Sequence, residues 1–457
     1  MRTLEILTII IILGALAALF TQKNRTIFLY AILAAIIIAI TQFFIEGLRW
    51  QFLPAIYIMP FMYASHRYYS GILNRLLKTV LILWVLIALI LPWVIPVFNL
   101  PHPRGEFDVG TETFHWVDSS RLEWFTPEKP DDLREIMAQV WYPGDNIGGS
   151  EPEPYLDNIA LRGKTIAAAG RLPSFLPRHL EYVKTNSYKN IACTKRVKNL
   201  PILIFSHGIT GSRHLHQVLF EYLASRGYVV IAPDHSFDAN LTVFPDQRIA
   251  DYRSNITGLP DSINIRRKQL DTRRADIHFL INQLERIQTK QIRSVLNKKL
   301  DLENIALGGH SYGGATALIS TYQDKRIKAC IVFDSWVSPL PEKIIADGVD
   351  VPLLFMGRPT WDNSDYPNNY LLLDSLMSSS LNPKYHLIIQ KTKHLDYTDI
   401  PLFSPIIKYV MDVGDLSSDI SLPLVNVLTH SFLDKHLVEK NSNRFNDVIK
   451  NNLIIHL

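Results

Sequence analysis

Hydrophobic residues are concentrated in the first hundred positions of this 457-residue chain. The runs 4–20 and 27–44 are almost purely apolar, and each is about long enough to cross a ~30 Å hydrocarbon core as a helix. A third long run covers 80–98, and a shorter one over 52–64 contains two prolines. The pattern predicts a transmembrane helical anchor over residues 1–100 with three or four spans.

The first run has a second interpretation, because Arg2 precedes it and Ala15-Leu16-Ala17 resembles the cleavage site of a signal peptide. However, a second apolar run follows after only a few polar residues, and nothing interrupts the helical pattern at the alanines. We therefore prefer an anchor that remains in the chain and crosses the membrane several times.

The number of spans decides the side of the membrane on which the rest of the chain lies. With four spans, the basic residues of 22–25 share a side with those of 67–78, whereas the other loops carry little more than Arg2 and Arg49. Basic loops favour the cytoplasm, so this arrangement places the C-terminal part outside it. Three spans would split the basic loops and leave that part in the cytoplasm. We favour four spans, a multi-pass protein and an extracytoplasmic C-terminal domain.

Beyond residue 100 the apolar runs become short and alternate with helix-like patterns. The first two runs predict an antiparallel opening, and the later ones predict buried parallel strands. Strands that alternate with helices form a mostly parallel sheet with helices on both faces. We expect strands at 114–117, 136–141, 201–205, 228–232, 305–308, 330–333, 351–356 and 385–389, and helices at 219–225, 262–287 and 315–320.

These elements predict one α/β domain over residues 101–457. Pro101, Pro103 and Gly105 mark its boundary with the anchor. Residues 145–190 contain clusters of Gly, Pro and Ser and have only weak helical periodicity. Because long stretches without clear elements are uncommon inside compact domains, we expect this one to be an insertion over the sheet edge or the active site.

The strongest local signal is the sequence GHSYG at 309–313, which follows an expected strand and precedes an expected helix. In this setting GxSxG forms a sharp turn that lifts the serine oxygen out of the sheet, and small residues on both sides let the backbone pass closely. Amides at the helix start face the negative charge that develops during acyl transfer. We therefore predict that Ser311 is a nucleophile in an α/β-hydrolase fold.

A serine hydroxyl needs a general base, and in this fold the chain order is serine, acid, histidine. His394 follows the strand expected at 385–389, at the end where parallel sheets bind ligands. It is therefore the preferred base. His386 lies inside an expected strand, and His430 and His436 lie in the last helical stretch, where structural roles are expected. The other histidines after the nucleophile are His386, His430, His436 and His456.

Two positions compete for the acid that orients the base. Asp334 directly follows the strand expected at 330–333, whereas Asp362 and Asp365 follow the next strand, expected at 351–356. Many hydrolases of this fold place the acid at the second position. Spacing along the chain does not decide between the two, so both stay open at this point.

Composition and charge indicate which binding partners are not expected. The formal net charge is +4 and 20% of the residues are charged, which gives no reason to expect nucleic acid. Cys193 and Cys330 form no CxxC pair, and no His/Cys cluster has metal-ligand spacing, so no metal is expected. Whether the two cysteines form a disulfide is left open. The basic stretch 266–268 is expected to be a solvated helix face.

Four segments resemble one known family. They are FSHG at 205–208, GHSYGGA at 309–315, FDSW at 333–336 with Pro339-Leu340 after it, and the segment from His394 to Asp399. Together they resemble the plasma-type platelet-activating factor acetylhydrolases and their bacterial relatives. The resemblance extends over about residues 110–440, is weak at 145–190 and does not include the anchor.

The resemblance implies a Ser-Asp-His triad in which Ser311 is the nucleophile, Asp334 the acid and His394 the base. It thereby favours the first of the two positions for the acid. It also implies an oxyanion hole formed by the backbone amides of Ile209 and Tyr312. No metal or other cofactor is implied.

The resemblance further implies the hydrolysis of short or oxidised acyl chains at the sn-2 position of phospholipids. A lipid or other ester substrate and the bilayer itself are then the expected partners, and anchoring would keep the domain beside its substrate. Alternatives are a general carboxylesterase, a thioesterase or an acyltransferase with the same triad, or a non-catalytic membrane protein on a hydrolase scaffold. The oligomeric state stays open.

Overall fold

The computed structural model describes residues 1–21, 25–68, 71–254, 262–439, 442–452 and 455–456. The polar residues 22–24, which connect the first two apolar runs, lie outside the described ranges. The chain forms two compact units, and the first contains the predicted anchor together with two short segments from far along the chain. The first unit consists of Met1–Asn99, Ala167–Val183 and Leu402–Ile407, and the second of Leu100–Ile166, Lys184–Pro401 and Lys408–Leu457.

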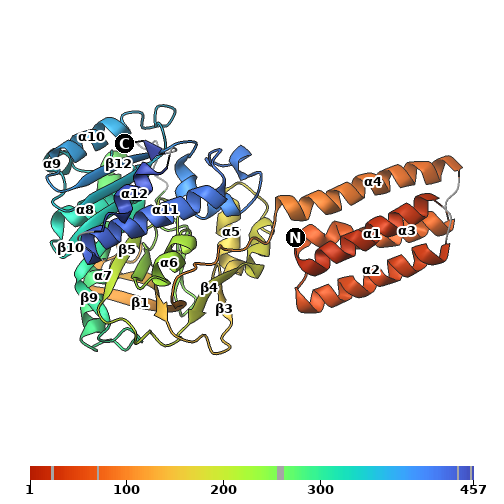
Figure 1. The fold of residues 1–457 in the computed structure, drawn as a ribbon, viewed down its shortest axis with the longest axis horizontal. Helices are drawn as coiled ribbons and strands as arrows, with labels where there is room; N and C mark the ends of the chain where they lie inside the picture. Colours follow the sequence, from red (N-terminus) through yellow and green to blue (C-terminus); the bar gives the residue numbers. More distant parts are fainter. Residues whose placement is uncertain (22–24, 69–70, 255–261, 440–441, 453–454, 457) are drawn as a thin grey trace. The chain divides into compact units, whose positions relative to one another are not determined.

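Four helices, red to orange in Figure 1, make up most of the first unit. Among the described residues, α1, α2 and the Arg75–Val94 part of α4 are long and apolar enough to cross a membrane. The remaining helix, α3, has 16 residues and contains Pro60. The helices are α1 (Thr3–Thr21), α2 (Arg25–Ile45), α3 (Leu53–Tyr68), which follows the 3-10 turn η1 (Trp50–Phe52), and α4 (Gly71–Val94).

A buried ion pair holds one end of these helices together. Arg49, just before η1, donates from Nε and Nη2 to the two carboxylate oxygens of Glu5 in α1, each at 2.7 Å. Its Nη1 donates to the carbonyl of Ile95, just after α4, at 2.8 Å. Glu46, which follows α2, accepts from the amide of Leu4 at 2.9 Å. The start of α1, the end of α2, the start of α3 and the end of α4 therefore meet, as in an up-and-down bundle.

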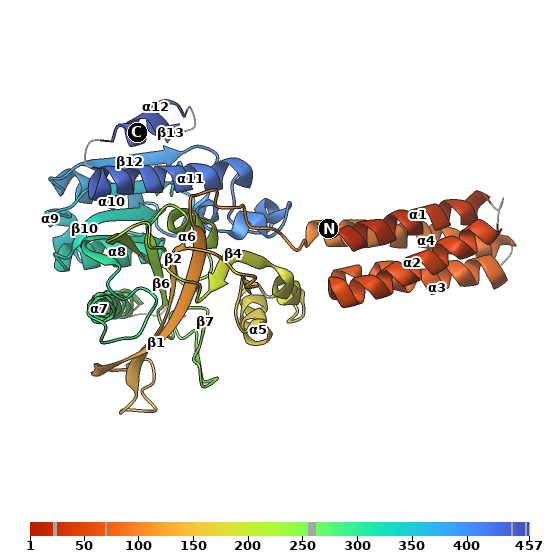
Figure 2. The same cartoon turned by 60° about the horizontal axis from the view of Figure 1, so that its bottom comes forward.

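The second unit contains a mostly parallel sheet, as predicted, with eleven strands among the described residues (Figure 2). Strands β12, β11, β10, β9, β5 and β6 run parallel, and β2 and β1 continue the sheet antiparallel beside β6. In sheet order the strands are β13 (Ile455–His456), β12 (Lys384–Ile389), β11 (Leu353–Gly357), β10 (Ile327–Phe333), β9 (Leu300–His310), β5 (Leu200–Ser206), β6 (Val229–Asp234), β2 (Leu133–Gly144), β1 (Asp108–Leu122), β4 (Lys184–Lys189) and β3 (Pro152–Pro154); β7 (Leu241–Val243) and β8 (Ile249–Asp251) form a separate pair.

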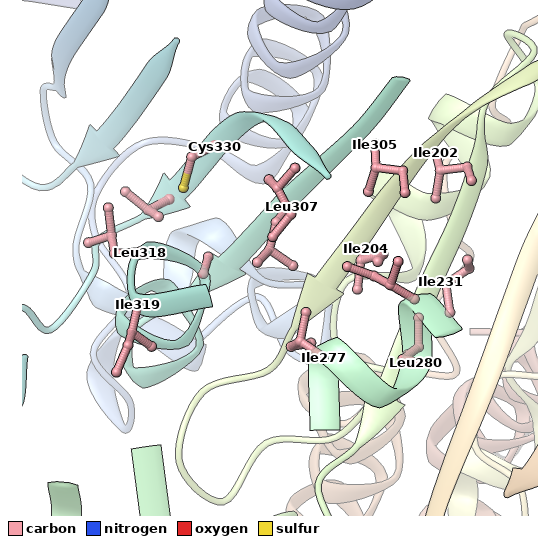
Figure 3. Packing of buried hydrophobic residues seen from close by; sticks show 14 of the residues in the cluster. Ile202, Ile204, Ile231, Ile277, Leu280, Ile305, Leu307, Leu318, Ile319 and Cys330 are labelled. Atoms are coloured by element: carbon pink, nitrogen blue, oxygen red, sulfur yellow. The ribbon is translucent and has the colours of Figure 1, made fainter. Parts of the chain in front are cut away.

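Alternate residues of the central strands belong to two hydrophobic cores. Ile204 and Leu307 share one core with Ile277 of α7 and with residues of α8, α9 and α10, and Figure 3 shows part of it. Leu203 and Ala306 share the other core with residues of α6, α11 and α12. A sheet covered on both faces explains the continuous apolar runs. The helices are α5 (Ile159–Ala169), α6 (Gln217–Ala224), α7 (Ser262–Gln288), α8 (Tyr312–Gln323), α9 (Glu342–Asp347), α10 (Asn369–Ser379), α11 (Ser418–Leu433) and α12 (Arg444–Lys450).

The stretch 145–190 is more regular than its weak periodicity suggests. It contains β3, α5, the 3-10 segment Leu176–Tyr182 and β4. β4 pairs in parallel with β1, where Ser187 lies opposite Val109, and β3 pairs with β4. The two strands of this stretch, β3 and β4, thus extend the sheet at its β1 edge. Sequence periodicity could not show this, because the pairing depends on partners far away in the chain.

Candidate active site

Ser311 lies on the tight turn between β9 and α8, and its side chain is partly exposed. Its backbone has φ 58° and ψ −121°, a conformation that L residues rarely adopt. A Cβ atom at Gly309 would overlap the carbonyl of Gly313, and one at Gly313 would overlap the carbonyl of Ser206. The two glycines therefore permit the close backbone approach on which the GxSxG prediction depends.

Two side chains that are far apart in the sequence form a hydrogen-bonded pair, here called the rim pair. His394 begins a 3-10 turn after β12, and its Nδ1 lies 2.6 Å from Oδ2 of Asp334, which directly follows β10. Asp334 is fully buried, whereas the His394 side chain is 22% exposed. The carboxylate accepts the Nδ1 proton, which leaves Nε2 of the ring as the basic nitrogen.

The carboxylate of Asp334 is held by further donors. Trp361 Nε1 donates to its Oδ1 at 3.0 Å, and the amide of Arg358 donates to the same oxygen at 3.2 Å. The Arg358 guanidinium lies 3.2 Å from Oδ2 and over the Trp361 ring. Burial alone would raise the pKa of Asp334, but the hydrogen bond and charge of His394 and the nearby Arg358 outweigh it, so this pKa lies below its usual value. The acid is therefore ionised at neutral pH.

His310 connects the turn that carries Ser311 to His394. Its Nε2 donates to the carbonyl of His394 at 2.8 Å, and the two ring centroids are 4.6 Å apart. The backbone amide of Ser311 donates to the carbonyl of Phe333 at 2.9 Å, next to Asp334. Among the described residues no hydrogen bond joins the Ser311 hydroxyl to the His394 ring. Catalytic hydrogen bonds are often long without substrate and tighten when it binds, so this geometry is compatible with a triad.

The two backbone amides expected to form an oxyanion hole, those of Ile209 and Tyr312, belong to segments next to Ser311. Gly208 packs against Ser311, because a Cβ on Gly208 would lie 3.3 Å from the Ser311 Cβ. The next amide along the chain belongs to Ile209. Tyr312 is the first residue of α8, and amides of a first turn have no partner within the helix. In the part of the chain that the structure describes, neither the Ile209 nor the Tyr312 amide donates to another protein group.

The competing candidates lie elsewhere. Asp362 and Asp365 are exposed and make no contact with His394 in the described structure. His386 lies in β12 and packs on Phe355, with its ring centroid 5.0 Å from the phenyl centroid. His430 lies in α11 and His436 in the turn after it, and His456 lies in β13.

Sequence reasoning missed a second Ser-His-Asp chain, here called the buried triad and formed by Ser206, His235 and Asp276. The Ser206 hydroxyl lies 2.9 Å from His235 Nε2, and His235 Nδ1 lies 2.9 Å from Asp276 Oδ2. All three residues are fully buried. Arg134 donates to both carboxylate oxygens of Asp276, at 3.0 and 2.5 Å. The chain order differs from that of the expected triad, so no spacing rule pointed to it.

The expectation for the basic stretch 266–268 is wrong at one position. Arg267 and Lys268 are exposed, but Arg266 is only 5% exposed and donates to Gln269 at 2.9 Å. Its carbonyl accepts from the Tyr312 hydroxyl at 2.5 Å. The side of α7 that carries Arg266 is thus buried where it meets α8, the helix that follows Ser311.

Both cysteines, Cys193 and Cys330, are free and buried. Burial raises the pKa of the Cys193 thiol to about 11 and that of Cys330 to about 12, which makes both poor nucleophiles. Among the described residues no three His, Cys, Asp or Glu side chains are grouped so that they could hold a metal ion.

Comparison with known proteins identifies the family. Residues 98–453 match the family "Platelet-activating factor acetylhydrolase, isoform II". The chain belongs to this family. The platelet-activating factor acetylhydrolase of Canis lupus familiaris is 27% identical over 363 residues, which cover 74% of this chain and 77% of the dog protein. The protein of the same name from Bos taurus is 25% identical over 382 residues, which cover 77% of this chain and 80% of the bovine one.

A solved structure shows the same fold. The ferulic acid esterase from Streptomyces cinnamoneus has a TM-score of 0.60 and 25% sequence identity, and the match covers 77% of this chain and 98% of the esterase. Family and fold together confirm the resemblance drawn from the four sequence segments, and this acetylhydrolase-family chain is a carboxylic ester hydrolase. The matched residues begin at 98, so the four N-terminal helices lie outside the matched part of the chain.

Proposed function

We propose that this family member is a serine hydrolase that acts through an acyl-enzyme, with Ser311 as nucleophile, His394 as base and Asp334 as acid. The observation that carries the proposal is the rim pair, in which a buried carboxylate orients a partly exposed imidazole beside the strained serine turn. The amides of Ile209 and Tyr312 would stabilise the oxyanion.

In the first half of the reaction, the Ser311 oxygen attacks the ester carbonyl while its proton passes to Nε2 of His394. The tetrahedral intermediate then expels the alcohol, which takes that proton from the imidazolium. In the second half, water attacks the acyl-enzyme, His394 accepts the water proton, and the collapse of the second intermediate returns it to Ser311 and releases the acid. Asp334 stays ionised throughout and stabilises the imidazolium.

For the substrate we propose phospholipids with short sn-2 acyl groups. The support is the family, whose relatives in dog and cattle are named for the hydrolysis of an acetyl ester. A membrane anchor would place such an enzyme beside its lipid substrate.

For the anchor we propose four spans over residues 1–100, followed by the catalytic domain 101–457 outside the cytoplasm. The Glu5–Arg49 ion pair lies at the bundle end from which the catalytic chain leaves. At the other end, Lys78 lies 5.3 Å from the centroid of the Phe20 ring. Arg25, Arg67 and Arg75 also lie near helix ends on that second side, whereas Arg2 and Arg49 lie at the first. The positive-inside rule assigns the more basic second end to the cytoplasm.

The function is tested with the full chain in detergent, by comparing phosphatidylcholines that carry a short or a long sn-2 acyl chain. We expect turnover of the short-chain lipid, weak turnover of the long-chain one, and loss of both in Ser311→Ala. Product analysis with thioester substrates and with acceptor alcohols separates hydrolysis from acyl transfer. Normal turnover by Ser311→Ala would reject the nucleophile, and a wild-type protein that reacts with no serine-directed probe would favour the non-catalytic scaffold.

A further inference from the structure

Arg273 of α7 is a buried arginine that contacts both sides of the expected oxyanion hole. Its side chain is 1% exposed, and its charge is balanced by an ion pair with the buried Asp238. Its Nη1 donates to the carbonyl of His207 at 2.6 Å, and its Nη2 lies 3.4 Å from the carbonyl of Gly208. Its guanidinium carbon also lies 4.7 Å from the centroid of the Tyr312 ring. One planar group therefore touches the loop after β5 and the first residue of α8.

The Gly208 carbonyl is surrounded by donors. His207 Nδ1 lies 2.7 Å from it, and the amide of Gly211 donates to it at 3.1 Å, in addition to the weaker contact from Arg273. Burial and the positive charge of Arg273 lower the pKa of His207 to about 3, so this ring is neutral and its single proton can serve Gly208. His207 Nε2 accepts from the amide of His235 at 3.1 Å, which fixes the tautomer.

The direction of one carbonyl decides the direction of the next amide. A peptide group is planar and trans, so its C=O and N–H point to opposite sides. The carbonyl of Gly208 points toward Arg273 and His207, and the amide of Ile209 in the same peptide group must point away from them. Gly208 itself packs against Ser311, so this peptide group lies beside the proposed nucleophile.

We propose that Arg273 is a positioning residue for the oxyanion hole, which holds the Gly208 carbonyl away from Ser311 and thereby keeps the Ile209 amide aimed at the developing oxyanion. This inference rests on the proposed serine hydrolase mechanism and names a residue that acts on it through the backbone. Lysine cannot replace this arginine, because only a planar guanidinium can contact Asp238 and the loop carbonyls at the same time.

The test uses Arg273→Lys, which keeps a cation beside Asp238, and the double variant Arg273→Met/Asp238→Asn, which removes both buried charges together. Active sites are counted by titration with a fluorophosphonate, so kcat refers to folded enzyme only. We expect kcat per titrated site to fall roughly tenfold to a hundredfold with little change in KM, because an imperfectly aimed oxyanion donor weakens the transition state more than the ground state.

A second readout separates positioning from a merely structural role. A short-chain alkyl trifluoromethyl ketone adds to the nucleophile and places an oxyanion in the hole, so its affinity should fall in parallel with kcat. Arg274→Met is the matched control, because Arg274 is the next residue on α7 and, among the described residues, its ion-pair partner is the exposed Asp271 at 2.9 Å. We expect this control to keep wild-type kcat and inhibitor affinity.

Unchanged kcat per titrated site and unchanged inhibitor affinity in the Arg273 variants would overturn the proposal. So would the failure of both variants to titrate any active site, which would assign Arg273 to folding alone. Wild type and Ser311→Ala are measured in the same assay. If wild type does not hydrolyse esters, or Ser311→Ala does, the proposed function fails; if those two behave as expected and only the Arg273 result is contrary, the positioning role alone fails.

Discussion

Two Ser-His-Asp arrangements lie in the same α/β unit, and they differ in access and charge. In the buried triad, Ser206, His235 and Asp276 form an unbroken chain of 2.9 Å contacts, yet all three are fully buried. At the rim, the His394 side chain is 22% exposed, and among the described residues no hydrogen bond joins its ring to the Ser311 hydroxyl. Hydrogen-bond pattern alone would therefore select Ser206 rather than the proposed nucleophile, Ser311.

The environments of the two carboxylates explain why the better-formed chain is not the expected catalytic one. Arg134 and Arg121 both pair with Asp276, so its charge is already used within the core. Burial lowers the pKa of His235, which favours its neutral form. All three side chains are inaccessible to solvent, and the His235 amide donates to His207, in the loop of the proposed oxyanion hole. Strain and access at the serine, rather than a complete hydrogen-bonded chain, distinguish the proposed site at Ser311.

The largest difference in activity is expected between variants of the two candidate acids, Asp334 and Asp362. Asp334→Asn should lower kcat by about 10⁴-fold, because an amide no longer stabilises the required His394 tautomer and imidazolium. Thermal unfolding should change little in comparison. Asp362→Asn is the control, since this aspartate is exposed and has no hydrogen bond or ion pair with His394 in the described structure. Steady-state kinetics with a short-chain ester decide the matter: a strong loss in the Asp362 variant and none in the Asp334 variant would reverse the assignment.

An aspartate-to-asparagine substitution in the buried triad should lower stability more than activity. Asp276→Asn leaves the buried Arg134 with only one ion-pair partner, Glu123, and should lower the free energy of unfolding by about 3 kcal/mol or more. Denaturation in detergent measures this loss. We expect kcat per titrated site to fall less than tenfold. A loss of activity as large as that of Asp334→Asn, with unchanged stability, would contradict the division of roles.

The turn that carries His394 should respond to pH through Asp396. Burial raises the pKa of Asp396 to about 6, although its Oδ2 accepts from the amides of Lys393 at 2.7 Å and Gly414 at 2.6 Å. The folded state thus binds this proton more tightly than the unfolded state, so stability falls as pH rises from about 4 to about 6.

Asp396→Asn keeps an acceptor for the two amides but cannot ionise. Above pH 6 the variant should therefore have a higher Tm than wild type, which corresponds to a gain on the order of 1 kcal/mol in the free energy of unfolding. Near pH 4 the two Tm values should be similar. Melting curves at several pH values provide the measurement. A constant difference in Tm across this range would show that Asp396 does not titrate there.

The smallest effect is expected from Ser206→Ala. It removes one buried hydrogen bond, to His235, and should cost about 1 kcal/mol of stability. Labelling by a fluorophosphonate and ester turnover should remain within about twofold of wild type, since Ser206 is not accessible. A large drop in labelling without loss of fold would mean that the buried serine reacts.

Local sequence patterns located the nucleophile turn and the strand ends, because both depend on neighbouring residues. The GxSxG turn at Ser311 and the placement of His394 after β12 are of this kind. Spacing left Asp334 and Asp362 open as the acid, and only the family resemblance favoured Asp334. The folded positions of the strand ends, which spacing does not contain, bring Asp334 against His394. The burial of Arg266 depends on how α7 packs against the nucleophile helix, and local charge patterns carry no information about it.

The account depends most directly on which serine becomes acylated. Mass-spectrometric mapping of the full chain after reaction with a fluorophosphonate identifies the modified residue without reference to any substrate. We predict a single adduct on the peptide that contains Ser311, and none after Ser311→Ala. An adduct on Ser206, or labelling that persists in Ser311→Ala, would contradict the account.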